Sequence, residues 1–447
     1  MRTIVIVLIL CLALPLVVVA QSECPAAVQT AVETTAANCT GLGLNEICFG
    51  HASVDTIVNC EDAPDFNTPG DIMPLEAVCA LRVGGWQPTS EWGVAMMQIE
   101  SSAGVPVTFA LFGGVEIHNA GSSLNEMQVW IVNDTGVYAG PGSHYETLLS
   151  LEVGDVVKVN ACNCTGNWLR LVMEDGRVGW IPALNATVVG DSSSLPIASL
   201  DTPVFEAMQA FTLSTNQDAP PCAESPASGI LIQVPADADP VPLQINGVHI
   251  SLNSTVFVRS SADELTLEML SGAAQVSASN LTMNVPAGTR VRIPLFEDNV
   301  PNEILHVESY SAEDVLALPV SLLPEAVDPT APLNLEIPQI IGVYECSVIS
   351  GTGDTSCPAY FINHDGDPIT RMDVEFHYAA QGEWEGSVTE PPTLLAGDYS
   401  SGVLSWNVSC NLGSANFIGP IQWWMTVTDE SGHTSEPFLA SFNCVDG

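Results

Sequence analysis

Short apolar alternations separated by Gly, Pro, Asn and Asp dominate the chain, and this period of two predicts β-strands joined by tight turns. The pattern is densest over residues 128–189, where a last pair of strands meets at Glu174–Asp175–Gly176. Closely spaced strands of this kind close into a small antiparallel barrel. The four preceding alternations are Gln128–Val132, Thr147–Leu151, Val156–Asn160 and Trp168–Val172.

Residues 23–119 combine a helical pattern with strand patterns. Apolar residues from Ala27 to Val32 recur at helical spacing, which predicts one amphipathic helix stapled by Cys24 and Cys39 near its ends. Two alternating runs further along predict paired strands, so we expect a small α+β domain that contains disulfides. The two runs are Trp92–Glu100 and Val105–Phe112.

The second half of the chain is predicted to be β-rich as well. Residues 190–228 are rich in Ser, Pro, Asp and Ala and indicate a linker. Short strands at even intervals over 229–297 predict a barrel or a stacked β-roll. Residues 298–337 indicate a spacer with a short helix capped by Ser311, and 338–447 predict a β-sandwich.

Two adjacent tryptophans in the last segment, Trp423 and Trp424, lie on a predicted strand. Because neighbouring residues of a strand face opposite sides, one of them should be in the core and the other outside. An exposed tryptophan could bind a sugar by stacking, and cover by a neighbouring loop or domain is the alternative.

Residues 128–189 carry motifs in the order found in bacterial SH3-like (SH3b) domains, which this segment resembles. They are Gly140–Pro141–Gly142, Tyr145, Val153–Asp155, Asn167–Trp168 and Asp175–Trp180. The resemblance implies recognition of a peptide or wall polymer in a groove lined by Tyr138, Tyr145, Trp168 and Trp180. For Trp168 and Trp180 a position in the barrel core is favoured over groove lining, because large aromatic side chains are highly buried on average. Tyr138 stands where the family often carries an Arg.

Three further resemblances concern the remaining segments. The run from Leu265 to Leu295 resembles a FecR-like domain, with Gly272 to Val276 and then Val285, Ala287, Gly288 and Val291 as the matching positions. The V-T-D-x-x-G-x-T hairpin near residue 430 resembles the closing hairpin of immunoglobulin-like (Ig-like) domains. The runs CPAAVQTAVETTAANC, NEICFG, FNTPGD, WGVAMMQI and VTFALFGGVEI resemble uncharacterised secreted multi-domain proteins of Chloroflexi-type bacteria.

The N-terminus reads as a secretory signal peptide over residues 1–20. An apolar run from Ile4 to Ala20 follows Arg2, and Val18 and Ala20 are small residues before the expected cleavage site. Later stretches do not reach about 18 consecutive apolar residues, so we expect no membrane span after signal removal. We therefore expect a secreted or envelope-associated protein.

The charge balance is strongly acidic. The sequence holds 52 acidic residues against nine Lys and Arg, which gives a formal net charge of −43. A field of this sign repels phosphate backbones, so nucleic acid is excluded as a partner. Hydrophobic residues make up 47% of the chain, which argues for folded domains.

Thirteen cysteines become an even number once Cys11 leaves with the signal, and an even number in an exported protein suggests disulfides. Spacing does not fix the pairing. Pairs Cys346–Cys357 and Cys410–Cys444 would keep the last domain self-contained. Cys162 and Cys164 are expected to be structural, with a redox or metal role as the alternative.

Catalytic motifs are absent from the sequence: there is no H-E-x-x-H, G-x-S-x-G, Walker loop or G-x-G-x-x-G. The eight histidines form no pair at metal-ligand spacing. Asp365–Gly366–Asp367 could bind calcium, but an ordinary Asp–Gly turn is the more common use of such residues. We expect no metal, no cofactor and no enzyme activity.

These observations predict a mainly β, multi-domain, non-enzymatic protein that binds a cell-wall or extracellular polymer or peptide through residues 128–189. One alternative is a structural or adhesive surface protein that acts through the Ig-like domain. Another is a hydrolase with an unrecognised site in residues 23–119.

Overall fold

The computed structural model describes the chain between residues 24 and 444 in several ranges, and the fold within them is mainly β, as predicted. The expected signal peptide lies outside these ranges, and so do the side chains of the four C-terminal cysteines. The described ranges are 24–58, 61–62, 66–86, 92–101, 104–121, 127–163, 165–173, 177–188, 195–200, 204–218, 222, 224–278, 281–296, 306–334, 336–343, 347–348, 354–378, 384–390, 392–397, 401–409 and 419–444.

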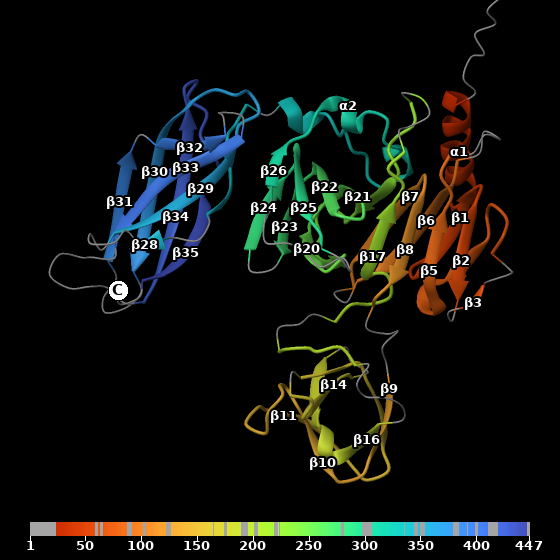
Figure 1. The fold of residues 1–447 in the computed structure, drawn as a ribbon. Helices are drawn as coiled ribbons and strands as arrows, with labels where there is room; N and C mark the ends of the chain where they lie inside the picture. Colours follow the sequence, from red (N-terminus) through yellow and green to blue (C-terminus); the bar gives the residue numbers. More distant parts are fainter. Residues whose placement is uncertain are drawn as a thin grey trace, which may run out of the picture.

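Two nine-stranded sheets, sheet A and sheet B, form the largest body of the protein (Figure 1). In order across the sheet, sheet A consists of β26 (His306–Ser309), β25 (Thr289–Pro294), β22 (Glu264–Ser271), β21 (Thr255–Ser260), β18 (Gly229–Gln233), β7 (Pro106–Phe112), β6 (Val94–Glu100), β1 (Glu46–His51) and β4 (Ile72–Pro74). Sheet B consists of β24 (Leu281–Pro286), β23 (Ala273–Ala278), β20 (Val248–Leu252), β19 (Val241–Ile245), β17 (Ala210–Thr215), β8 (Val115–Asn119), β5 (Val78–Val83), β2 (Val54–Val58) and β3 (Glu61–Asp62).

The pattern of apolar residues explains why sheet A is the middle layer. In β7 every residue after Pro106 is buried, whereas β19 alternates between buried and half-buried positions. Residues such as Phe109 and Ile230 face the core shared with sheet B, while Phe112 and Leu231 face the other way. A strand buried on both faces needs a nearly continuous apolar run, and VTFALF provides it.

A layer of short helices covers the outer face of sheet A. It contains α1 (Cys24–Asn38), α2 (Ala312–Val315) and the 3-10 helices η6 (Val320–Leu322) and η7 (Ala331–Asn334), and η1 (Leu75–Ala77) lies elsewhere in the chain. The layer packs on the sheet through Val28, Ala31, Tyr310, Val315 and Leu318, which are all buried. Residues 298–337 were expected to be a spacer, and this expectation is wrong because their apolar residues complete a core.

The predicted boundary between residues 23–119 and 229–297 is also corrected by the sheets. β7 pairs with β18, with Leu111 opposite Ile230, so the two segments share sheet A. β8 pairs with β17, with Ile117 opposite Leu213, so the expected linker supplies a strand of sheet B. A single core therefore runs through both segments. The strands predicted at 92–100 and 105–112 are confirmed as the β6–β7 pair.

Two disulfides are seen among the described cysteines. Cys24 at the start of α1 bonds to Cys222, 198 residues away, and Cys39 bonds to Cys48 on β1. The predicted helix is confirmed, and both cysteines near its ends form disulfides, though not with each other: their partners come from a strand and a loop of the same body.

A small barrel, called here the inserted barrel (residues 127–198), interrupts the body between β8 and β17 (Figure 1). Its core contains Val129, Val137, Leu169 and Ile181, and Leu195 closes it. One sheet has the order β11 (Thr147–Leu151), β10 (Thr135–Tyr138), β15 (Val178–Pro182), β14 (Trp168–Val172), β13 (Ala161–Cys162). The other has β12 (Val156–Val159), β9 (Met127–Ile131) and β16 (Ala186–Val188), preceded by the 3-10 helix η3 (Ala183–Asn185).

The C-terminal segment is a two-sheet sandwich, as predicted, with nine described strands where seven were expected. Its core contains Phe361, Leu404, Met425 and the fully buried Trp423. One sheet has β27 (Gln339–Val343), β29 (Asp354–Ile362), β33 (Ser401–Ser409) and β32 (Thr393–Gly397), with β28 (Ser347–Val348) beside β29. The other has β31 (Trp384–Glu390), β30 (Ile369–Tyr378), β34 (Gly419–Asp429) and β35 (Phe438–Cys444).

The adjacent tryptophans on β34 confirm the alternation expected from the sequence, since Trp423 is fully buried and Trp424 is 39% exposed. In the described parts of the chain, none of the helices has the length and apolar character required to cross a bilayer.

Candidate functional site

An aromatic pair on the inserted barrel is the strongest candidate for a binding surface. Tyr138 at the end of β10 and Trp168 at the start of β14 meet edge to face, with ring centroids 5.6 Å apart. Both side chains are half-buried, so each keeps part of its ring in solvent. An aromatic ring that is held on one side and open on the other can bind an apolar or sugar surface at low entropic cost.

The loop Gly140–Pro141–Gly142 follows Tyr138 closely in the chain and packs on Tyr145. A Cβ atom at Gly140 would lie 2.8 Å from the ring of Tyr145, so the ring packs directly on the glycine backbone. The backbone N–H of Tyr145 donates to the carbonyl of Gly142 at 3.2 Å, and its ring lies 4.2 Å from that of His144. The glycines are needed here because any side chain would displace the tyrosine.

The expectation that Trp180 lines the surface is wrong. Trp180 is fully buried and packs with Ala161, Ala198 and the inner part of Trp168. Trp180 is covered by a chain segment that lies beyond the predicted barrel. This segment is held in place because the N–H of Ala198 donates to the carbonyl of Cys162 at 2.8 Å. Trp180 therefore supports Trp168 from beneath instead of contacting a ligand.

A second exposed tryptophan, Trp130, was missed by the sequence analysis. It is 49% exposed on β9, directly opposite Val156 of β12, which is 46% exposed. The signal was present in the alternation of Met127–Ile131, because Val129 and Ile131 are buried and Trp130 must then face outward. This surface lies on a different sheet from Tyr138.

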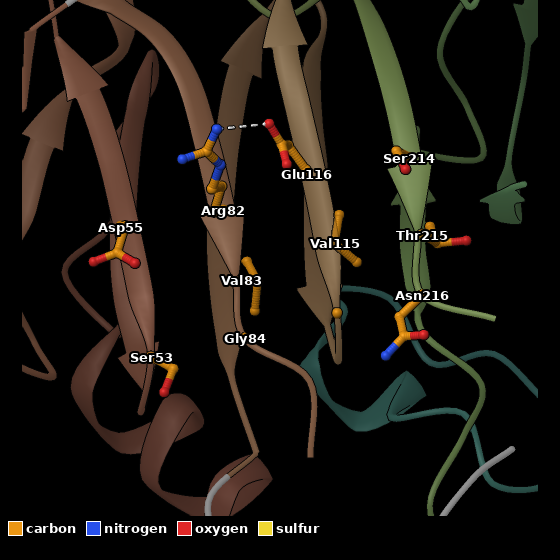
Figure 2. Close-up of a pocket in the computed structure, with 11 residues that line it drawn as sticks. Ser53, Asp55, Arg82, Val83, Gly84, Val115, Glu116, Ser214, Thr215 and Asn216 are labelled. Atoms are coloured by element: carbon orange, nitrogen blue, oxygen red, sulfur yellow. Dashed lines mark hydrogen bonds and ion pairs between the residues drawn. The ribbon is translucent and has the colours of Figure 1, made fainter. Parts of the chain in front are cut away.

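A polar pocket of about 500 Å³ lies on the outer face of sheet B (Figure 2). Arg82 donates to Glu116 at 3.0 Å across neighbouring strands, and Asp55, Ser214 and Asn216 complete the wall. The hydrogen bond from Arg82 lowers the pKa of Glu116 below its usual range. The lining of this pocket is therefore polar and carries an ionised carboxylate paired with an arginine.

One group in the C-terminal sandwich could hold a metal ion. Asp365, Asp429 and His433 each offer a ligand atom, and these atoms lie within 4.8 Å of one another. Asp429 already accepts a hydrogen bond from the backbone N–H of His433 at 2.8 Å. The N–H of Gly366 donates to the carbonyl of Asn363 at 3.1 Å, so the Asp365–Asp367 segment forms the turn that the sequence favoured.

The comparison with known families finds a match within the inserted barrel. Residues 136–185 match the model of the variant SH3 domain, and the match spans Tyr138, Tyr145, Trp168 and Trp180. An SH3-like domain indicates a role in binding. A search of the curated proteins finds no match to this chain.

Proposed function

We propose that this protein is a secreted, non-enzymatic binding protein whose inserted barrel recognises a cell-wall or extracellular polymer or a peptide. The match to the variant SH3 domain supports a binding role. The two disulfides are compatible with an oxidising, extracellular compartment.

The observation that carries this proposal is the half-buried pair Tyr138 and Trp168 beside a loop that only glycine allows. The pair is fixed from below by the buried Trp180, so its geometry exists before a ligand arrives. Preorganised aromatic side chains lose little conformational entropy on binding.

The charge of the chain restricts the ligand class. A net charge of −43 repels anionic polymers at long range, so the ligand is expected to be uncharged or cationic over the contacted length. Sugar rings and extended peptides both present flat apolar faces with hydrogen-bonding edges, which suit an aromatic pair.

Retention on insoluble wall material tests the proposal. The purified protein should be retained on peptidoglycan or envelope polysaccharide, and Tyr138→Ala should weaken retention by about tenfold because half of the aromatic pair is removed. Trp130→Ala is the matched control, because Trp130 is a more exposed aromatic residue on the other sheet of the same barrel. Loss of retention with Trp130→Ala alone would refute the Tyr138 site.

A second candidate function, adhesion through the C-terminal sandwich, is favoured by the exposed face of β34 and β35. Trp424 stands opposite Leu439, and both are exposed, at 39% and 53%. If this face carries the function, deletion of residues 338–447 should abolish association with partner cells while retention on wall material is unchanged.

A further inference from the structure

A cavity of about 440 Å³ lies on the outer face of sheet A, away from the inserted barrel. Its floor is β21, which contributes Phe257 and Arg259. One wall is α2 with the residues after it, which contribute Glu313 and Ala317, and the opposite wall includes Pro226. The segment with Pro226 follows Cys222, which the disulfide to Cys24 anchors to α1.

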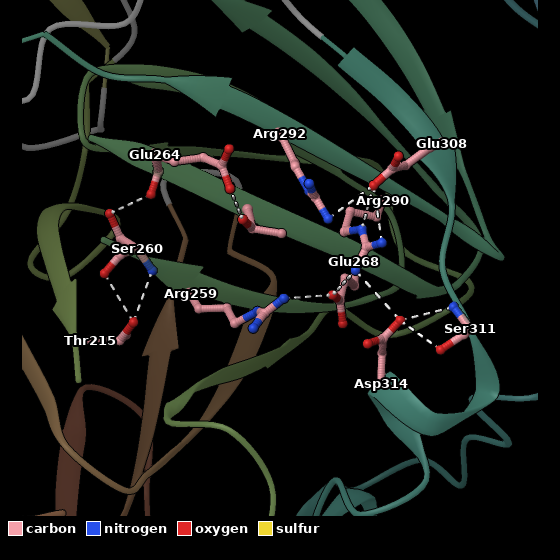
Figure 3. Close-up of polar contacts among 11 residues, drawn as sticks. Thr215, Arg259, Ser260, Glu264, Glu268, Arg290, Arg292, Glu308, Ser311 and Asp314 are labelled. Carbon is pink, nitrogen blue, oxygen red and sulfur yellow. Dashed lines mark hydrogen bonds and ion pairs between the residues drawn. The ribbon is translucent and has the colours of Figure 1, made fainter. Parts of the chain in front are cut away.

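The floor of the cavity belongs to a network in which the scarce positive charge of the chain is concentrated. Three of the nine basic residues lie on β21 and β25, around the buried Glu268 of β22 (Figure 3). Arg290 contacts Glu268 at 3.4 Å, Glu308 at 3.0 Å and Asp314 at 3.4 Å. Arg292 contacts Glu308 at 3.1 Å.

Arg259 makes an ion pair with one described residue, whereas Arg290 contacts three. One terminal nitrogen, Nη2, contacts Glu268 at 3.2 Å. Its Nε is buried and finds no partner among the described residues. The side chain is 30% exposed and lines the cavity, so a guanidinium edge is available to a ligand there.

The carboxylate of Glu268 is shared between Arg259 and Arg290. Burial raises the pKa of Glu268 above its ordinary value, even though Arg259 and Arg290 act in the other direction. A second carboxylate on the free edge of Arg259 would satisfy donors that Glu268 leaves unpaired, because a guanidinium has five donors in a planar fork.

The wall formed by α2 offers a negative group of its own. Glu313 is exposed and makes no hydrogen bond or ion pair with any described residue. Its neighbour Asp314 is already occupied, since it accepts from Ser311 at 2.9 Å and from Arg290 at 3.4 Å. The cavity is therefore lined by one carboxylate without a partner among the described residues, Glu313, and by Arg259, which Glu268 contacts only through Nη2.

We infer that this cavity binds a zwitterion of amino-acid size, such as a free amino acid, with its carboxylate on Arg259 and its ammonium group on Glu313. Among the apolar lining residues Phe257 and Pro226 are buried and Ala317 is half-buried, so the room for a side chain suits a small aliphatic group. This site is independent of the proposed polymer binding, since it shares no residue with the inserted barrel.

Calorimetric titration of the full protein with L-leucine and L-alanine tests the inference. Binding is expected, and propionate and propylammonium, which each carry one of the two charges, should bind about tenfold more weakly. Glu313→Gln should weaken L-leucine binding by about three- to tenfold, and Arg259→Gln should weaken it further. Arg371→Gln and Glu430→Gln, which lie on the C-terminal sandwich, should leave it unchanged.

Two results would overturn the inference. The first is the absence of binding by either amino acid up to about 20 mM, far above the range expected for a two-charge contact. The second is propionate binding as tightly as L-leucine with no effect of Glu313→Gln, which would show an anion site. Glu313 is on the surface, so its variant remains informative even if Arg259→Gln weakens the fold.

Discussion

Trp423 and Trp424 allow a direct comparison of burial at two adjacent residues. Trp423→Ala removes a fully buried indole from the core of the C-terminal sandwich and should cost about 3–5 kcal/mol. Trp424→Ala removes a side chain that is 39% exposed and should cost less than about 1 kcal/mol. Urea denaturation of the two variants measures the difference, and equal losses would contradict the assigned core.

The buried Glu268 should make the stability of the body depend on pH. Its folded-state pKa is raised, so the unfolded chain ionises first as the pH rises above about 4.5. The contribution of this group to the free energy of unfolding therefore falls as the pH rises from there to the folded-state pKa. The Glu268→Gln variant has no group that titrates at this position. Its stability relative to the unmodified protein should therefore increase as the pH rises through this range.

Asp314 is a control residue whose pKa is shifted in the opposite direction to that of Glu268. Although burial opposes it, the hydrogen bonds from Ser311 and the charge of Arg290 lower the pKa of Asp314. Its stabilising contribution is present above pH 3.8 and is lost as the pH falls through the folded-state pKa. Thermal melts of Glu268→Gln, Asp314→Asn and the unmodified protein between pH 3 and 8 measure both trends. Parallel curves for all three would contradict this account of the network.

Among the elements, α1 is held by two disulfides of very different loop length. The Cys24–Cys222 bond closes 198 residues and the Cys39–Cys48 bond closes nine. In the chain-entropy model, loss of the disulfide that closes the long loop lowers the free energy of unfolding by about 5 kcal/mol. Loss of the disulfide that closes the short loop lowers it by about 2.5 kcal/mol. The melting temperatures of the two double Cys→Ala variants test this order. A larger fall in melting temperature on loss of the Cys39–Cys48 bond would contradict the prediction.

The sequence predicts which segments form helices or strands where the pattern involves residues close together in the chain. The helix at 24–38, the β6–β7 pair and the opposite orientations of Trp423 and Trp424 all follow from spacing within a few residues. The pairing of β7 with β18 could not be predicted, because the inserted barrel and β17 lie between them and β-strand pairing has no local signal. For the same reason the boundaries drawn at composition changes cut through sheets A and B.

In the candidate site too, the sequence predicted what depends on local motifs and did not predict contacts between distant segments. Tyr138 and Trp168 were identified because they stand beside recognisable motifs, and the structure brings them into contact. The core position that residue type favoured for Trp180 is the one it takes, but the segment that covers it, residues 195–198, lies outside the pattern of the barrel and was not foreseen. Arg259 and Glu313 were missed because they are distant in sequence and neither belongs to a motif.

At the scale of the whole molecule, the inserted barrel should be removable without loss of the body. β8 and β17 are neighbours, and the N–H of Ala120 donates to the carbonyl of Ala210 at 2.8 Å, so a short turn could join them. Replacement of residues 122–204 by a Gly/Ser turn should therefore leave the body folded. A fragment of residues 23–119 should not fold, because it lacks the strands that complete both sheets.

The most direct test of the central claim is the retention of this barrel-deleted protein on the wall material that retains the full protein. The circular dichroism spectrum should first confirm that the deleted protein is folded. We predict that it is folded and no longer retained, because Tyr138 and Trp168 have been removed with the barrel. Retention of a folded protein without the barrel would contradict the proposal that the barrel carries recognition.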